Sequence, residues 1–334
     1  MLLAFVARRI LRLIPLLFLV SILAFLIIQL PPGDYLTEYI SRLEASGYKV
    51  EDDEIARLKN LYALDKPMHE QYLKWISNIV LYGDFGQSFQ WNKPVREVIG
   101  ERMMLTFIIA LSTTIFVWIV ALPIGIYVAV RQYTFADYLF TFIGFIGLAV
   151  PGFLLAMVVM YVAYSSFGVR VGGLFAPEYE LLPWSLAKVG NMMTRIWVPI
   201  VILGIGGTAQ LIRVMRATML DELRKQYVTV ARAKGLSEWK VLLRYPVRIA
   251  INPLLSTIGW LLPWFISGGT IVDIVLNLPT AGPVLWRSLM SQDMFLAGSY
   301  ILIIATLTMF GSLISDILLA VVDPRIRFGR VEER

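Results

Sequence analysis

Long apolar stretches alternate with shorter polar ones along the whole chain of 334 residues. Each apolar stretch reaches the roughly 20 residues that an α-helix needs to cross the hydrocarbon core of a bilayer. The pattern therefore predicts an all-α membrane protein with six transmembrane helices. We place these helices at residues 1–30, 103–130, 138–167, 195–217, 249–277 and 296–322.

The composition agrees with a membrane protein. Hydrophobic residues make up 58% of the chain and charged residues 16%, whereas a soluble domain has roughly 25% charged residues. The chain has no Cys and a single His, His69. These counts exclude a disulfide framework, a thiolate metal site and a metal site built from several His side chains. We expect His69 to be a solvated surface residue.

Basic residues indicate which polar segments face the cytoplasm. They cluster in residues 8–12, at Arg131, in residues 213–248 and in the tail at residues 323–334. With an even number of helices, this distribution predicts that both termini are cytoplasmic. The formal net charge of +6 could suggest nucleic-acid binding. We reject that reading, because the basic residues sort by membrane side and form no single stripe with interleaved aromatic residues.

The first apolar stretch, residues 1–30, could be a secretory signal. Its apolar run is longer than the ~7–15 residues of a signal sequence, and no small-x-small cleavage site follows it. We predict a retained first helix, with Pro15 kinking or delimiting its first turn. Residues 31–102 then form an extracytoplasmic segment, residues 103–322 a five-helix core, and residues 323–334 a cytoplasmic tail.

Helix-breaking residues interrupt the third apolar stretch, which contains Gly144, Gly147 and the pair Pro151-Gly152. Such residues are tolerated in a membrane where neighbouring helices or water satisfy the freed backbone groups. They suggest a bend inside a helical bundle. The glycines could equally allow close helix packing, and for each glycine taken singly we favour packing.

The basic segment at residues 213–248 has the local chemistry of two short helices joined by a hinge. Residues 220–234 contain no Gly or Pro. They begin with acidic side chains and end with basic ones, which suits the helix dipole. Gly235 follows, where a left-handed residue would end the helix. We refer to residues 220–248 as the elbow.

A second helix of the elbow is predicted to begin after Ser237, a good N-cap residue, with Leu236 placed to pack on Val241. Anionic lipid headgroups could hold a basic loop of this kind, at roughly 1 kcal/mol per basic residue. Lipid contact accounts for the charge, but it does not account for a glycine hinge between two capped helices.

The sequence Y-V-T-V-A-R-A-K-G-L-S-E at residues 227–238 resembles the cytoplasmic EAA loop of bacterial ABC importer permeases of the peptide/nickel type. The resemblance covers nearly the whole chain. It includes L-D-K-P at residues 64–67, G-D-F-G-Q-S-F at 83–89, K-P-V at 93–95 and D-P-R at 323–325. Thr229 and Val230 replace a Glu and an Ala of the general motif, and residues 245–248 replace its I-x-L-P, as is usual in the peptide type.

The resemblance implies that the loop between helices four and five holds a coupling helix that docks on an ATPase subunit. The matched positions are Tyr227, Ala231, Ala233, Gly235 and Leu236. It further implies a second homologous permease subunit, two ATPase subunits that bind ATP and Mg, and an extracytoplasmic solute-binding protein. The chain contains no G-x-x-x-x-G-K-[ST] motif, so we expect no cofactor and no catalytic residue in it.

The extracytoplasmic segment at residues 31–102 is predicted to contain helices at residues 51–64 and 67–81, each with an apolar stripe. Because an apolar stripe must be buried somewhere, we favour a small cap on the helical bundle. The alternative is that the segment also helps to dock the solute-binding protein.

The fifth apolar stretch holds candidate residues of a translocation pathway or gate: Trp260, Trp264, Phe265 and Asp273. An ionisable residue inside a membrane helix suggests a function, because its burial in lipid costs at least ~2.5 kcal/mol. Asp273 lies near the outer end, so it could instead reach the interface. The segment I-V-D-I-V-L-N-L-P-T-A-G resembles a family motif, with Thr280 where the family usually has Gly.

The cargo is less well determined. Peptide is the usual cargo of the family type, while residues 31–40 and the sparsely charged fifth stretch also resemble permeases for plant oligosaccharides.

Two other classes of protein agree less well with the sequence. A secondary transporter predicts an inverted repeat between the two halves, which we do not find, and an intramembrane enzyme needs paired polar residues at one depth. Asp273 and Asp316 lie near opposite faces.

Overall fold

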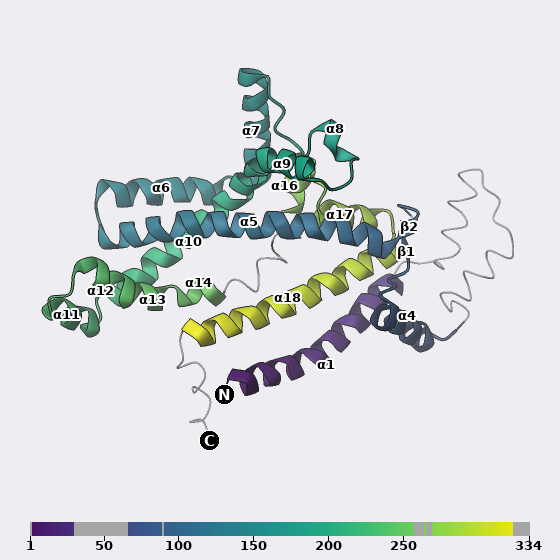
Figure 1. Cartoon of the computed structure of the whole chain (residues 1–334), viewed down its shortest axis with the longest axis horizontal. Helices are drawn as coiled ribbons and strands as arrows, with labels where there is room; N and C mark the ends of the chain where they lie inside the picture. The colour runs from purple at the N-terminus through teal and green to yellow at the C-terminus, as the bar shows by residue number, and fades with distance from the viewer. Residues whose placement is uncertain (1, 30–65, 89, 257–263, 265–268, 323–334) are drawn as a thin grey trace. The chain divides into compact units, whose positions relative to one another are not determined.

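The computed structural model describes residues 2–29, 66–88, 90–256, 264 and 269–322. The predicted helix at residues 51–64, the tail at residues 323–334, and the side chains of Trp260 and Phe265 lie outside these ranges. The described part is mostly helical. Its elements are α1 (Leu2–Gln29), α4 (Met68–Tyr82), β1 (Gln87–Ser88), β2 (Lys93–Pro94), α5 (Val95–Val130), α6 (Phe135–Ala149), α7 (Gly152–Phe167), α8 (Pro177–Glu180), α9 (Leu186–Arg195), α10 (Trp197–Leu223), α11 (Gln226–Ala233), α12 (Glu238–Arg244), α13 (Pro246–Ala250), α14 (Asn252–Ser256), α16 (Thr270–Val275), α17 (Ala281–Met290) and α18 (Met294–Val322) (Figure 1).

Four helices of the described chain are long and apolar enough to cross a membrane. They are Arg9–Ile27 within α1, α5, α10, and Phe295–Leu319 within α18. They match four of the six predicted helices and establish a multi-pass helical membrane protein. Helix α5 begins at Val95, eight residues before the predicted start at residue 103. The polar first turns of α5 extend the helix beyond its apolar part.

The predicted third helix is broken in two. Helices α6 and α7 meet at an angle of 98°, and α7 turns away from the line of α6 (Figure 1). Val150, between them, has the extended conformation (φ −82°, ψ 120°) that a residue before proline favours, and Pro151 is the N-cap of α7. The sequence thus predicted the position of the bend, and a bent pair raises the number of candidate spans to at most five.

The predicted fifth helix, residues 249–277, is only partly described. Its described parts are the end of α13 and the short helices α14 and α16. A count of six membrane helices therefore remains a prediction. The polar stretches outside the predicted spans also contain helices that the sequence analysis did not predict: α8, α9 and α17.

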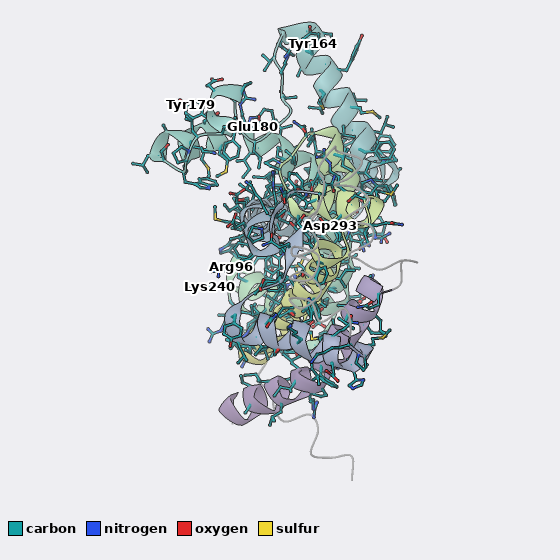
Figure 2. All side chains as sticks on the ribbon, turned by 90° about the vertical axis from the view of Figure 1, so that its right-hand side faces the viewer. Arg96, Tyr164, Tyr179, Glu180, Lys240 and Asp293 are labelled. Atoms are coloured by element: carbon teal, nitrogen blue, oxygen red, sulfur yellow. The ribbon has the colours of Figure 1, made fainter. Side chains whose placement is uncertain are left out.

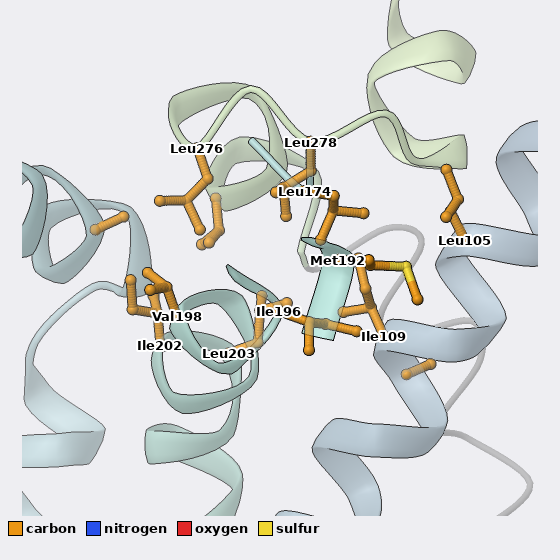
Figure 3. Close-up of a cluster of buried hydrophobic side chains, with 13 residues drawn as sticks. Leu105, Ile109, Leu174, Met192, Ile196, Val198, Ile202, Leu203, Leu276 and Leu278 are labelled. Atoms are coloured by element: carbon orange, nitrogen blue, oxygen red, sulfur yellow. The ribbon is translucent and has the colours of Figure 1, made fainter. Parts of the chain in front are cut away.

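The chain forms two compact units. The first comprises Met1–Ile10, Leu105–Pro283 and Leu307–Arg334, and the second comprises Leu11–Met104 and Val284–Thr306. In the first unit, one apolar cluster joins residues of α5, α7, α9, α10 and α16 (Figure 3). A second cluster joins α5 and α10 to α12, α13 and α14. Both clusters include α10, so this helix connects the two apolar cores of the first unit.

Small residues let α10 approach its neighbours closely. A Cβ atom added to Gly125 of α5 would lie 2.7 Å from the Cβ of Met215, and one added to Gly147 of α6 would lie 3.0 Å from Ile205. Both neighbours belong to α10. These glycines are packing positions, as we favoured for Gly147. At the end of α18, the Asp316 carboxylate accepts a hydrogen bond from Arg9 of α1 at 3.1 Å.

In the second unit, Asp293, which is labelled in Figure 2, precedes α18. Its side chain is fully buried. Its carboxylate accepts hydrogen bonds from the Ser88 hydroxyl of β1 (2.5 Å) and from the Gln90 backbone (3.2 Å). The two-stranded hairpin of β1 and β2 is thereby joined to the start of α18. The predicted helix at residues 67–81 is confirmed as α4, and its stripe residue Trp75 is buried against Phe25 of α1.

Candidate functional site

The elbow is a set of short helices that follow α10 directly. Helix α10 ends at Leu223, and α11 begins at Gln226. The single helix predicted at residues 220–234 is therefore wrong. The break at residues 224–225 lets Val228 pack in a buried cluster with α12. The free energy gained by this burial outweighs that of continuing a single helix. Residues 224–226 are all good helix formers, so local propensity gave no sign of the break.

Gly235 ends α11 and separates it from α12. Its φ of 74° lies in the left-handed region, as predicted. A Cβ atom at this position would meet no heavy atom within 4 Å. Glycine is therefore required here by the backbone conformation and not by lack of space.

The elbow has its own small apolar core. Val228 and Ala231 of α11 and Val241 of α12 are buried, and Tyr227, Leu236 and Tyr245 pack around them. The predicted packing of Leu236 near Val241 is confirmed. Ser237 is the N-cap residue of α12, as predicted, but its side chain makes no capping hydrogen bond. Because this end of α12 is exposed, water can satisfy its free N–H groups.

The five predicted coupling positions divide into two sets in the structure. Ala231 is buried, and Tyr227 and Leu236 are partly buried in the elbow core. Ala233 and Gly235 are exposed. The first three shape the elbow, and the last two lie on its surface. The spacing of Val228 and Ala231, three residues apart, is the sequence signal that could have identified the buried side.

The surface of the elbow carries apolar residues that the sequence analysis missed. Val230 of α11 is 52% exposed, and Trp239 and Leu243 of α12 are 67% and 43% exposed. Exposed basic residues lie among them: Arg232, Lys234, Lys240 and Arg244 (Lys240 is labelled in Figure 2). The surface is thus apolar and basic, which suits contact with another protein more than contact with water alone.

Tyr227 connects α11 to the end of α10, because its hydroxyl donates a hydrogen bond to the Glu222 carboxylate. Burial and the neighbouring Glu222 raise the pKa of Tyr227. We expect Tyr227→Phe to loosen α11, since a hydrogen bond to a charged group contributes about 1.5–3 kcal/mol. Hydrogen exchange of residues 226–233 should become faster.

Tyr245→Phe is the matched control for Tyr227→Phe. Tyr245 packs against Tyr227 with ring centroids 6.2 Å apart, and its hydroxyl has no hydrogen-bond partner among the described residues of the chain. We expect its exchange pattern to be unchanged. Equal acceleration in both variants would contradict a specific role of the Tyr227 hydroxyl.

Arg232 and Glu238 bridge α11 and α12 through an ion pair of 2.6 Å between Nη2 and Oε1. Arg232 holds the pKa of Glu238 below its usual value of 4.5. A carboxylate with a lowered folded-state pKa contributes stability that is present above the unfolded-state pKa and is lost as the pH falls through the folded-state value. Because the side chains are 44% and 52% exposed, this contribution is at most about 1 kcal/mol.

We therefore expect the elbow to lose a little hydrogen-exchange protection as the pH falls below about 4.5, the unshifted pKa of Glu238. The variant Glu238→Gln should lack that step and show lower protection at pH 7. The measurement is exchange of residues 226–244 over this pH range, corrected for intrinsic exchange rates. The same pH step in Glu238→Gln would assign it to another group.

The predicted pathway residues are placed only in part. Trp264 is 47% exposed, and Asp273 of α16 is buried, with 3% of its surface exposed. The Asp273 carboxylate accepts a hydrogen bond of 2.6 Å from the Thr280 hydroxyl, and the Asp273 carbonyl accepts one from the Leu278 backbone. Asp273 thus closes the turn after α16. Its burial argues against the alternative that it reaches the interface, and Thr280 supplies the donor that a glycine there would lack.

The described residues contain no group of three or more His, Asp or Glu side chains that could hold a metal ion. Instead, the long apolar helix α10 is followed by a folded, basic elbow with its own apolar core. Several long apolar helices and this folded elbow define a multi-pass helical membrane protein with a structured polar element.

Comparison with known sequences gives the family. The sequence model of the binding-protein-dependent transport system inner membrane component matches residues 121–328. A second model, of the N-terminal part of such membrane components, matches residues 2–112. The chain belongs to this family and is an ABC importer permease of the peptide/nickel type, a multi-pass protein of the inner membrane.

Relatives of known name align over nearly their full length. The oligopeptide transport system permease protein AppB of Bacillus subtilis is 33% identical over 327 residues, which cover 97% of this chain and 99% of the relative. The glutathione transport system permease protein GsiC of Escherichia coli is 31% identical over 324 residues, with the same coverage. The inner membrane ABC transporter permease protein YejB of Escherichia coli is 28% identical over 363 residues.

Proposed function

We propose that this permease forms half of the translocation pathway of an ATP-driven importer for oligopeptides. The other half is a second homologous permease subunit. Two ATPase subunits bind ATP and Mg on the cytoplasmic side, and an extracytoplasmic solute-binding protein delivers the cargo. Both termini face the cytoplasm, and residues 31–102 face outward. The chain itself carries out no covalent chemistry and holds no cofactor.

The observation that carries this proposal is the elbow. A helix–glycine–helix unit with a buried core of Val228, Ala231 and Val241 moves as a rigid unit. It follows α10 after a break of two residues, and α10 belongs to both apolar cores of the first unit. An ATPase cycle can bias two transport states only through contacts that differ between them. The elbow surface is built to make such contacts.

Peptide is the better supported cargo. AppB and GsiC are named for oligopeptide and glutathione transport, and the same family membership supports a related cargo here. The residues of the predicted pathway, Trp264 and Asp273 among them, stay candidates for cargo contact. An oligosaccharide cargo is the outcome that would replace this part of the proposal.

The test is purification of the tagged protein from its native membrane in mild detergent, with mass spectrometry of every protein that accompanies it. We expect P-loop ATPases, a second permease of this family and a solute-binding protein. The solute-binding protein is then screened for peptides against oligosaccharides. A homo-oligomer without an ATPase would overturn the importer assembly, and binding of oligosaccharides alone would overturn the cargo.

A further inference from the structure

A buried ion pair joins α6 to α10 within the first unit. Arg216 donates two hydrogen bonds of 2.8 Å to the two carboxylate oxygens of Asp137. The Asp137 side chain is 3% exposed and that of Arg216 28%. The Tyr133 backbone N–H donates a third bond of 3.0 Å to the same carboxylate. Asp137 is therefore fixed both to α10 and to the turn that precedes α6.

The pair lies close to the elbow along the chain. Arg216 is seven residues before the end of α10 at Leu223, or about two helical turns. Asp137 is in the first turn of α6. A displacement of the elbow that moves the end of α10 therefore acts on the start of α6 through two charge-assisted hydrogen bonds, which are stronger than neutral ones.

Beyond the ion pair, α6 and α10 pack through small residues. A Cβ atom added to Gly144 would lie 3.8 Å from the Cβ of Ala209, and one added to Gly147 would lie 3.0 Å from Ile205. An interface of this closeness has little free volume, so its two helices resist sliding against each other. The two glycines lie in the second half of α6, and the ion pair lies at its start.

At its other end, α6 leads into the 98° break before α7. Helix α7 contacts α16, because a Cβ atom on Gly152 would lie 3.2 Å from Val272. The break separates α6, which is fastened to α10, from α7, which packs on α16 and also shares an apolar cluster with the first turns of α10. The break itself lies at residues 150–151, where Pro151 has no backbone N–H to donate to a helical hydrogen bond.

We propose that Asp137 and Arg216 are positioning residues that fasten α6 to α10, so that the elbow moves both helices as one body. The inference rests on the proposed function, since it concerns how the importer transmits movement. It assigns the transmission step to a pair that is 79 residues apart in sequence. A purely structural pair would stabilise the fold without affecting uptake per ATP.

The first experiment loosens the connection. Asp137→Asn and Arg216→Lys are introduced into the complete importer in proteoliposomes, and ATP hydrolysis and peptide uptake are measured together. We expect uptake per ATP to fall about 2- to 30-fold, the range found for residues that modulate coupling. Arg213→Lys is the matched control, because Arg213 lies on the same helix and, among the described residues, its side chain bonds only to Gln210 of that helix. Arg213→Lys should leave uptake per ATP unchanged.

The second experiment replaces the ion pair with a covalent link. The chain has no Cys, and the 3.8 Å between the Cβ positions of residues 144 and 209 suits a disulfide. Gly144→Cys and Ala209→Cys are combined, oxidised in proteoliposomes and reduced again with dithiothreitol. If the two helices move as one body, the disulfide leaves uptake intact. In the Asp137→Asn background, it restores uptake per ATP until it is reduced.

Two outcomes would overturn the inference. One is a disulfide that stops uptake in the otherwise unmodified chain, which would mean that α6 and α10 must slide during transport. The other is a disulfide that forms fully but restores nothing in Asp137→Asn. Failure of the proposed function is separate from both, because the unmodified importer would then show no ATP-driven peptide uptake at all, and the inference would fall with it.

Discussion

Replacing Gly235 with valine is expected to uncouple ATP hydrolysis from uptake while the protein still inserts into the membrane. Gly235 has a φ of 74°, and an L-residue in that conformation costs roughly 1–2 kcal/mol, more when it is β-branched. A penalty of this size shifts the population of the native elbow by about 5- to 30-fold. We expect uptake per ATP to fall by a similar factor.

The Gly235 position suits this measurement, because an added Cβ atom meets no heavy atom of the chain within 4 Å. A loss in Gly235→Val that Gly235→Asn does not share therefore reports on the backbone conformation. Gly235→Asn is the first control, since Asn tolerates the left-handed region, and it should retain most of the uptake. Gly190→Val is the second, because Gly190 of α9 also faces open space but has ordinary helical φ. Uptake at the normal level by Gly235→Val would remove the hinge from the mechanism.

The sequence predicted those features of the fold that depend on local chemistry. Continuous apolar runs identified α1, α5, α10 and α18, since only a helix satisfies its own backbone in lipid. The Pro151-Gly152 pair marked the break between α6 and α7. The angle of that break could not be predicted, because it depends on how α7 packs against α16, and that packing joins residues more than a hundred positions apart.

The same distinction holds for the elbow. Gly235 was predicted correctly because a left-handed residue at a helix end is a local requirement. The break at residues 224–225 was not predicted, because it depends on the burial of Val228 against Val241. The pair of Asp137 and Arg216 was also invisible in the sequence. Either residue alone resembles a charge at a helix end, and only the packing of α6 on α10 brings them together.

The second large effect is expected when Ala231 or Ala233 of α11 is replaced by leucine. These two alanines lie two residues apart, on opposite sides of the helix. Ala231 is 4% exposed in the elbow core, whereas Ala233 is exposed. We expect Ala231→Leu to force α11 away from α12, since overpacking costs about 1–3 kcal/mol. Hydrogen exchange of residues 226–244 should accelerate, and less ATPase should be retained during purification.

Ala233→Leu adds the same side chain to the exposed side of α11, so hydrogen exchange of the isolated chain should be unchanged. Its effect should appear only in the assembly, as reduced retention of the ATPase, because a larger side chain at a docked surface disturbs the fit. The two variants thus separate the shape of the elbow from its contact surface. Full retention of the ATPase by Ala233→Leu would move the docking surface away from this side of α11, toward Trp239 and Leu243 of α12, which are exposed as well.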